Sequence, residues 1–132
     1  MSAMALLSPT ADHRSPITNE AVTRGCRAAL SWTVHRHGDL VRITLDGELD
    51  HATAPALDVL VRPLAEAGCD LVVGLAGLRF CDCSGLTLFE RWRSLAAVAG
   101  GSLRLTAPSR IVRRLLTLTD TLDLLTITDR GR

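Results

Sequence analysis

A strand pattern that passes directly into a helix pattern limits the fold of this chain more than any other feature. Residues 71–75 form a continuous apolar run of strand length, and from Ser84 onward apolar side chains recur at helical spacing. The first backbone N–H groups of a helix have no partner within the helix, and the peptide dipoles leave that end partially positive. The segment 82–86 is therefore predicted to be a turn at a sheet edge that accepts negative charge.

The rest of the chain repeats this alternation. Gly38 and Asp39 can turn a hairpin between two alternating stretches, and Gly47 is expected to end the second of them. Thr53 is expected to cap the first helix, and Pro63 to kink or loosen it. The expected elements are strands at 32–37 and 40–45, a helix at 54–67, a strand at 70–75, a helix at 84–99, a strand at 102–106, a helix from Pro108 and a strand at 122–128. They predict an α/β fold with a small mixed sheet, first a hairpin and then parallel strands joined by right-handed crossovers.

The length fits one domain preceded by a segment without periodicity. A chain of 132 residues can bury roughly two-thirds of its unfolded surface, and 47% of these residues are hydrophobic. Residues 1–29 mix Ser, Pro, Thr and Arg, and we expect a flexible N-terminal tail outside the fold. The folded domain is expected to cover residues 30–132.

Charge and composition exclude several classes of partner. The net charge is +1 and aromatic residues make up 3% of the chain, so no nucleic-acid surface is expected. No apolar run approaches the roughly 20 residues of a membrane helix. The short apolar patch at 4–7 is not expected to be a signal peptide, because no basic residue precedes it. One basic cluster is expected to be a solvated helix face with apolar residues behind it. Its arginines are Arg110, Arg113 and Arg114, and the apolar residues are Ile111, Val112, Leu115 and Leu118.

The four cysteines argue against a metal site or a disulfide framework. No spacing among Cys26, Cys69, Cys81 and Cys83 matches a zinc knuckle, and the last pair is too close in sequence for an unstrained disulfide. Reduced thiols in a cytoplasmic protein, without metal or cofactor, are the expected state.

Two turns carry the side chains that could do chemistry. In the first, Gly47, Glu48, Asp50 and His51 follow a strand. Carboxylates beside a histidine can do acid–base work, but Asp and His are also ordinary residues of strand-to-helix turns, and we favour that interpretation. No serine–histidine–aspartate order or phosphate-cradling glycine motif accompanies them, so nothing in the chain requires catalysis.

The second turn contains Asp82, Cys83, Ser84 and Gly85. Asp82 fits either a helix cap or a functional carboxylate. Cys83 fits either a reactive thiol, which a helix N-terminus favours, or an inert small residue beside Asp82. Ser84 fits either a phosphate acceptor or a cap, and Gly85 is expected to permit close approach of backbone or of a partner.

The residues of both turns resemble those of the STAS-domain anti-sigma factor antagonists of bacteria. The matching segments are LDGELDHATA at 45–54 and LRFCDCSGL at 78–86, and the arginine-rich helix after Ala107, Pro108 and Ser109 fits as well. The resemblance covers about residues 31–128 and implies a small sheet with helices packed mainly on one side. It also implies a function by binding.

The same resemblance implies a phosphorylation switch. In that family the antagonist binds an anti-sigma factor, commonly a serine kinase, and frees the sigma factor. The kinase inactivates the antagonist by phosphorylating a serine at the start of the helix, and a phosphatase reverses this. The usual acceptor directly follows the Asp, which is Cys83 here, and Ser84 is the only hydroxyl at the switch. With Cys83 at the acceptor position, three alternatives stay open: the switch is absent, is shifted to Ser84, or is replaced by thiol chemistry. Gly74 is a second departure, because the family often has an Asp or Asn late in the central strand.

We expect a cytoplasmic, non-enzymatic regulator of transcription that works by partner switching. Its expected partner is an anti-sigma factor of the histidine-kinase-like ATPase type, with no nucleic acid, membrane or cofactor, and the protein itself is expected to be a monomer or a weak dimer. The expected partner surface consists of Gly47, Glu48, Asp50, His51, Asp82, Cys83, Ser84 and Gly85. Two alternatives stay open: a STAS module of a transporter-associated or scaffold assembly, and a thiol-based redox sensor or enzyme that uses Cys81 and Cys83.

Overall fold

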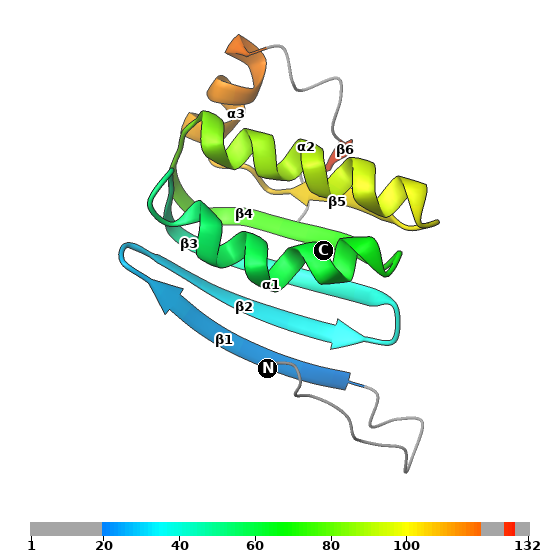
Figure 1. The fold of residues 1–132 in the computed structure, drawn as a ribbon. Coiled ribbons are helices and arrows are strands. Elements are labelled where there is room, and N and C mark those ends of the chain that lie inside the picture. Colours follow the sequence, from blue (N-terminus) through cyan, green and yellow to red (C-terminus); the bar gives the residue numbers. More distant parts are fainter. Residues whose placement is uncertain (1–19, 120–125, 129–132) are drawn as a thin grey trace.

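The computed structural model describes residues 20–119 and 126–128, which form one six-stranded sheet and three helices (Figure 1). The elements are β1 (Glu20–Arg27), β2 (Leu30–His37), β3 (Leu40–Leu49), α1 (Ala54–Glu66), β4 (Asp70–Cys81), α2 (Cys83–Val98), β5 (Ser102–Thr106), α3 (Arg110–Leu118) and β6 (Thr126–Thr128). The strands lie side by side in sequence order; β1 to β3 are antiparallel and β3 to β6 are parallel. The expected mixed sheet with alternating helices and parallel strands is confirmed.

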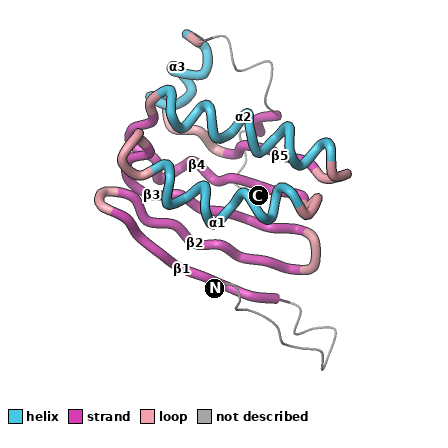
Figure 2. Tube along the Cα trace, viewed as in Figure 1, coloured by secondary structure: helices cyan, strands magenta, loops and turns pink. Residues whose placement is uncertain are grey.

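The core lies between one face of this sheet and the helices, which Figure 2 shows in front of the strands. Alternate side chains of a strand point to the same face, and in β3 Val41, Ile43 and Leu45 are fully buried while their neighbours are exposed. From the helix side, α2 inserts Phe89 and Trp92, whose ring centroids lie 5.9 Å apart at a tilted angle. A chain with few aromatic residues thus places its two largest buried rings on one helix.

β1 corrects the expected boundary of the tail. Residues 20–27 pair in antiparallel register with β2, from Glu20 opposite His37 to Arg27 opposite Leu30, whereas residues 1–19 lie outside the described part of the chain. Most side chains of 21–29 are exposed, because β1 is an edge strand with little to bury, and it therefore lacks the apolar alternation that marks a strand. Gly25 leaves room for the indole of Trp32, which would lie 2.6 Å from a Cβ at that position.

β3 and β4 extend beyond their expected ends. β5 pairs with β4 only as far as Gly74, but β3 and β4 stay paired up to Leu49 and Cys81. The expectation that Gly47 ends a strand is wrong: the strand continues through Gly47 with two register shifts, and its φ of 110° lets the backbone pass close to the carbonyl of Ala29. The extension carries both candidate turns at its tip.

The helices differ from expectation in smaller ways. α1 runs to Glu66, three residues beyond Pro63, which was expected to kink or loosen it. α3 begins at Arg110 rather than at Pro108, and residues 122–125 of the last expected strand lie outside the described residues. Two of the apolar residues that were expected behind the arginines of α3 are exposed instead, Ile111 by 62% and Leu118 by 72%.

Candidate functional site

The two candidate turns lie side by side at the carboxyl ends of β3 and β4. These strands are parallel neighbours, and the backbone N–H of Asp82 donates to the carbonyl of Leu49 at 3.1 Å. Figure 1 shows the start of α1 and the start of α2 at the same end of the molecule. The sheet therefore brings together the eight residues that the sequence singled out, although they come from two separate segments.

The first turn is held by Asp50 and Thr53. Oδ1 of Asp50 accepts the backbone N–H groups of Ala52 at 2.9 Å and Thr53 at 3.0 Å. The Thr53 hydroxyl donates to the carbonyl of Glu48 at 3.0 Å and accepts the N–H of Asp50 at 2.9 Å. Thr53 stands at the N-cap position of α1 but makes no capping bond with its side chain, so the expected side-chain cap is wrong. The carboxylate of Asp50 binds N–H groups of two residues that precede the helix.

These bonds account for the ionisation of Asp50. Its pKa lies below the ordinary value, chiefly because the N–H of Thr53 donates to the carboxylate, and also because Ala52 does so. An ionised carboxylate that accepts several N–H groups stabilises a turn and is a poor proton acceptor for catalysis. This geometry agrees with the interpretation of the first turn as an ordinary polar turn. Of its other residues, Gly47 is buried, Glu48 half-buried and His51 exposed.

The second turn begins α2 with a side-chain cap. Asp82 is the N-cap residue, with extended backbone dihedrals, and its Oδ1 accepts the backbone N–H of Ser84 at 2.8 Å. Of the two roles that the sequence left open for Asp82, the structure shows the helix cap. Cys83 is exposed and Ser84 half-buried, while the Thr87 hydroxyl donates to the carbonyl of Cys83 at 2.9 Å.

Gly85 fits between two side chains. A Cβ at this position would lie 2.6 Å from Sγ of Cys81 and 2.8 Å from Cδ2 of Leu49, closer than real contacts permit. The sequence predicted close approach of backbone or of a partner at Gly85, but the groups that approach it in the structure are core side chains of β3 and β4. The absence of a side chain at Gly85 thus lets α2 pack closely on the sheet tip.

Cys81 and Cys83, the two cysteines at the second turn, lie in different environments. Cys81 is 5% exposed, and burial raises the pKa of its thiol to about 12, with a smaller contribution from the charge of Asp82. Cys83 is exposed, and both are free thiols. A thiol that keeps its proton is neither a nucleophile nor a metal ligand, so Cys81 does not support thiol chemistry at this turn.

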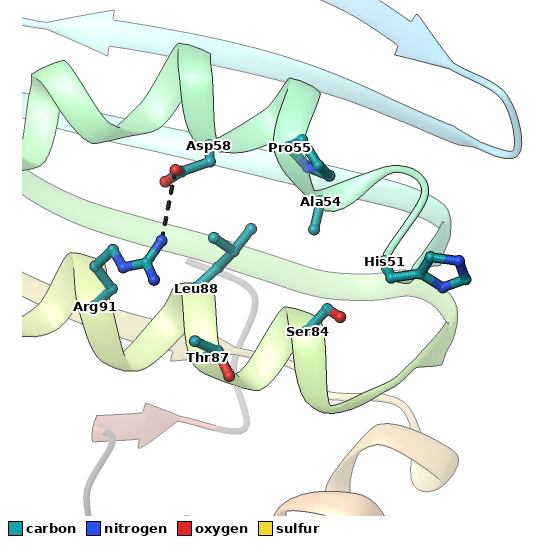
Figure 3. Close-up of a pocket in the computed structure, with 8 residues that line it drawn as sticks. All are labelled: His51, Ala54, Pro55, Asp58, Ser84, Thr87, Leu88 and Arg91. Carbon is teal, nitrogen blue, oxygen red and sulfur yellow. Dashed lines mark ion pairs between the residues drawn. The ribbon is translucent and has the colours of Figure 1, made fainter.

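A groove of about 350 Å³ runs between α1 and α2 and reaches the second turn (Figure 3). Its lining residues are His51, Ala54, Pro55, Asp58, Ser84, Thr87, Leu88 and Arg91. Figure 3 shows Ser84 and His51 at one end and the ion pair of Asp58 with Arg91, 3.7 Å long, at the other. Sequence reasoning missed the other α2 residues here, although their spacing of three, four and seven from Ser84 places them on the same helix face.

Other kinds of site find little support in the described ranges. No three His, Cys, Asp or Glu side chains come together there as candidate ligands of a metal ion. In the same part of the chain, the helices are too short or too polar to cross a membrane.

Comparisons with known proteins agree with this architecture. The family model described as "Mlab, STAS domain" matches residues 32–126. The anti-sigma-B factor antagonist of Bacillus subtilis is 33% identical over 91 residues, which cover 69% of this chain and 84% of that protein.

Solved structures of similar fold include an anti-sigma factor antagonist from Mycobacterium paratuberculosis, with a TM-score of 0.70 and 21% identity over 80% of this chain and 90% of that one. The anti-sigma factor antagonist SpoIIAA in its unphosphorylated form has a TM-score of 0.57 and 25% identity, covering 83% of this chain and 90% of that one. Sheet order, the one-sided helix layer and these matches together show that the chain belongs to the STAS domain family.

Proposed function

We propose that the protein is an anti-sigma factor antagonist, which binds an anti-sigma factor and thereby frees a sigma factor for transcription. The observation that carries this proposal is the position of the exposed start of α2 beside the first turn. It is supported by the anti-sigma-B factor antagonist to which the chain is 33% identical. The proposed function is binding, without a catalysed reaction, and it is exerted in the cytoplasm where sigma factors act.

The proposed contact surface consists of the exposed and half-buried residues of the two turns. They are Glu48, Asp50, His51, Asp82, Cys83 and Ser84. Gly47 and Gly85 are buried and shape this surface from below. Because Asp50 and Asp82 are held by hydrogen bonds to backbone N–H groups, the surface is ordered before a partner arrives, which lowers the entropic cost of docking.

The proposed partner is an anti-sigma factor of the histidine-kinase-like ATPase type, and Ser84 is the proposed phosphate acceptor. Ser84 lies in the first turn of α2 and faces the groove, so a phosphate there would add nearly two negative charges beside Asp82. The helix end tolerates this charge, but an interface that must lose water on docking does not. Phosphorylation of Ser84 would therefore weaken binding.

Release of the sigma factor tests the antagonist function directly. Preformed complexes of each such anti-sigma factor of the source organism with its sigma factor are mixed with the protein, and free sigma factor is measured by size-exclusion chromatography. The proposal expects free sigma factor with one of these complexes. If every complex stays intact while the protein remains folded, the antagonist function is wrong, and co-purification with a transporter or scaffold component would favour the alternative assembly.

The switch is tested by incubating the partner kinase, ATP and the protein, followed by mass spectrometry of the peptide that contains Cys83 and Ser84. We expect phosphate on Ser84 in the wild type and none in Ser84→Ala. A Cys83→Ser variant restores a hydroxyl directly after Asp82 and serves as the matched control for kinase competence. If Cys83→Ser is phosphorylated at position 83 while the wild type stays unmodified, the antagonist lacks the switch at Ser84.

A further inference from the structure

The outer face of α3 is an exposed surface that combines apolar and basic side chains. Ile111 and Leu118 are 62% and 72% exposed, and they lie seven residues apart, which is about two helical turns and thus the same face. Arg114 lies between them on that face and Arg110 lies at its start, both exposed. We call the surface of Arg110, Ile111, Arg114 and Leu118 the α3 outer face.

α3 is fixed firmly, so this face has a defined position. The Ser109 hydroxyl caps the helix by accepting the N–H of Val112 at 3.3 Å, and it donates to the carbonyl of Leu78 at 3.0 Å. That carbonyl belongs to the part of β4 that β5 does not reach. Val112 and Leu116 are fully buried on the inner side. The exposure of Ile111 and Leu118 therefore does not come from a helix that is loosely attached.

The arginines of this face have charges that the fold leaves unused. Neither Arg110 nor Arg114 forms an ion pair in the described part of the chain, and the first turn of α3 contains no acidic residue. A cation in the first turn of a helix is disfavoured by the peptide dipoles, so Arg110 does not stabilise the helix on which it lies. Both guanidinium groups are available to carboxylates of another molecule.

The α3 outer face lies at the same end of the molecule as the proposed contact surface. Figure 1 shows α3 beside the start of α2, and the bond from Ser109 to Leu78 places the first turn of α3 four residues before Asp82 along β4. A partner that docks on the start of α2 therefore comes within reach of α3. Other strongly exposed apolar residues of the helices, such as Val59 and Val98, have no such arginine pair on their face.

We propose that the α3 outer face is a second contact for the anti-sigma factor, and that it receives a partner segment with carboxylates beside an apolar side chain. This inference rests on the proposed function and adds the chemistry of the partner. The apolar side chain packs between Ile111 and Leu118, and the carboxylates pair with Arg110 and Arg114. Such an interface has an apolar centre with a charged rim, the usual anatomy of protein–protein contacts.

Isothermal titration of the anti-sigma factor tests this contact with two variants and two matched controls. Ile111→Asp and the double variant Arg110→Glu/Arg114→Glu are each expected to weaken binding at least about tenfold. The controls Val98→Asp and Arg104→Glu alter exposed residues elsewhere and are expected to stay within about twofold. Circular dichroism confirms that each variant is folded. Raising the salt concentration should weaken the wild type more than the double variant.

The outcomes separate this inference from the proposed function. If both α3 variants bind like the wild type while Ser84→Glu does not bind, the α3 contact is wrong and the antagonist function stands. If the wild type binds no anti-sigma factor, both fail. A basic and apolar helix face also suits an anionic membrane, so co-sedimentation with phosphatidylglycerol vesicles is measured in parallel; binding to vesicles that the double variant loses would assign the face to lipid and overturn the inference.

Discussion

Nε1 of Trp92 donates a hydrogen bond of 2.8 Å to Oδ1 of Asp58, which joins α2 to α1 across the core. The other carboxylate oxygen, Oδ2, lies 3.1 Å from Arg62 and 3.7 Å from Arg91. The bond involves the largest buried ring of the protein and a side chain that lines the groove. One carboxylate thus links α1 to α2 beside the groove, and we expect the stability of this helix contact to depend on it.

Replacement of Asp58 is expected to show this dependence. Asp58→Ala leaves a buried indole N–H without an acceptor and should lower the free energy of unfolding by about 1–3 kcal/mol. Asp58→Asn keeps an acceptor and should lose less. Urea unfolding followed by circular dichroism measures both, with Glu66→Ala as the control for an exposed acid of the same helix. Equal stability of Asp58→Ala and Glu66→Ala would contradict the role of the bond.

Gly85→Ala tests the close packing of α2 on the sheet tip. Alanine favours a helix by up to about 1 kcal/mol over glycine, so helix propensity alone predicts stabilisation. The structure predicts the opposite, a loss of about 1–3 kcal/mol, because the new methyl group meets Cys81 and Leu49.

A double-variant cycle measured by urea unfolding isolates this steric effect. Gly85→Ala should cost less in a Cys81→Ala background, where one of the two contacts is removed. Stabilisation by Gly85→Ala in the wild-type background would show that the tip can open to admit a side chain.

The first turn is expected to make stability depend on acid pH. The folded protein holds the pKa of Asp50 below its ordinary value, so the unfolded chain binds this proton more readily. The contribution of Asp50 is then fully present above the unfolded pKa and is lost as the pH falls through the folded pKa. Urea midpoints between about pH 6 and pH 3 should fall more steeply in the wild type than in Asp50→Asn. Parallel curves for the two proteins would contradict this assignment.

The sequence predicted the parts of the fold in which local patterns and tertiary packing agree. The run at 71–75 is buried on the sheet and indicated a strand, and Asp82 indicated a cap because its side chain bonds only two residues away. β1 was missed because an edge strand with exposed side chains has no apolar period. The extension of β4 to Cys81 was missed because its pairing with β3 after Gly74 depends on register shifts, which leave no local signal.

The candidate site also has parts that the sequence predicts and parts that it does not. Its residues could be predicted because two turns after parallel neighbouring strands must meet at one sheet edge. The groove and the α3 outer face could not, since they depend on how helices pack on one another. For example, the spacing within α3 made Ile111 and Leu118 as good candidates for the core as Val112. Only the position of the helix beside β4 decides which side of the helix is buried.

The thiols offer a last test of the turn. At about pH 8, iodoacetamide should modify the exposed Cys26 and Cys83 rapidly, and the buried Cys69 and Cys81 only after unfolding. Burial raises the pKa of the Cys81 thiol in the folded protein to about 12, above its ordinary value of 9.0. Ionisation above 9.0 therefore favours the unfolded chain, and stability should fall as the pH rises past that value, less so in Cys81→Ala.

Mass spectrometry of the alkylated protein identifies the modified cysteines, and Cys83→Ser should remove one of the two rapid modifications and leave the other unchanged. Modification of Cys81 in the folded protein as fast as that of Cys83 would mean that the tip of β4 opens in solution. The turn would then expose two thiols beside the start of α2, and a thiol-based sensor would replace the docking surface as the better account of this site.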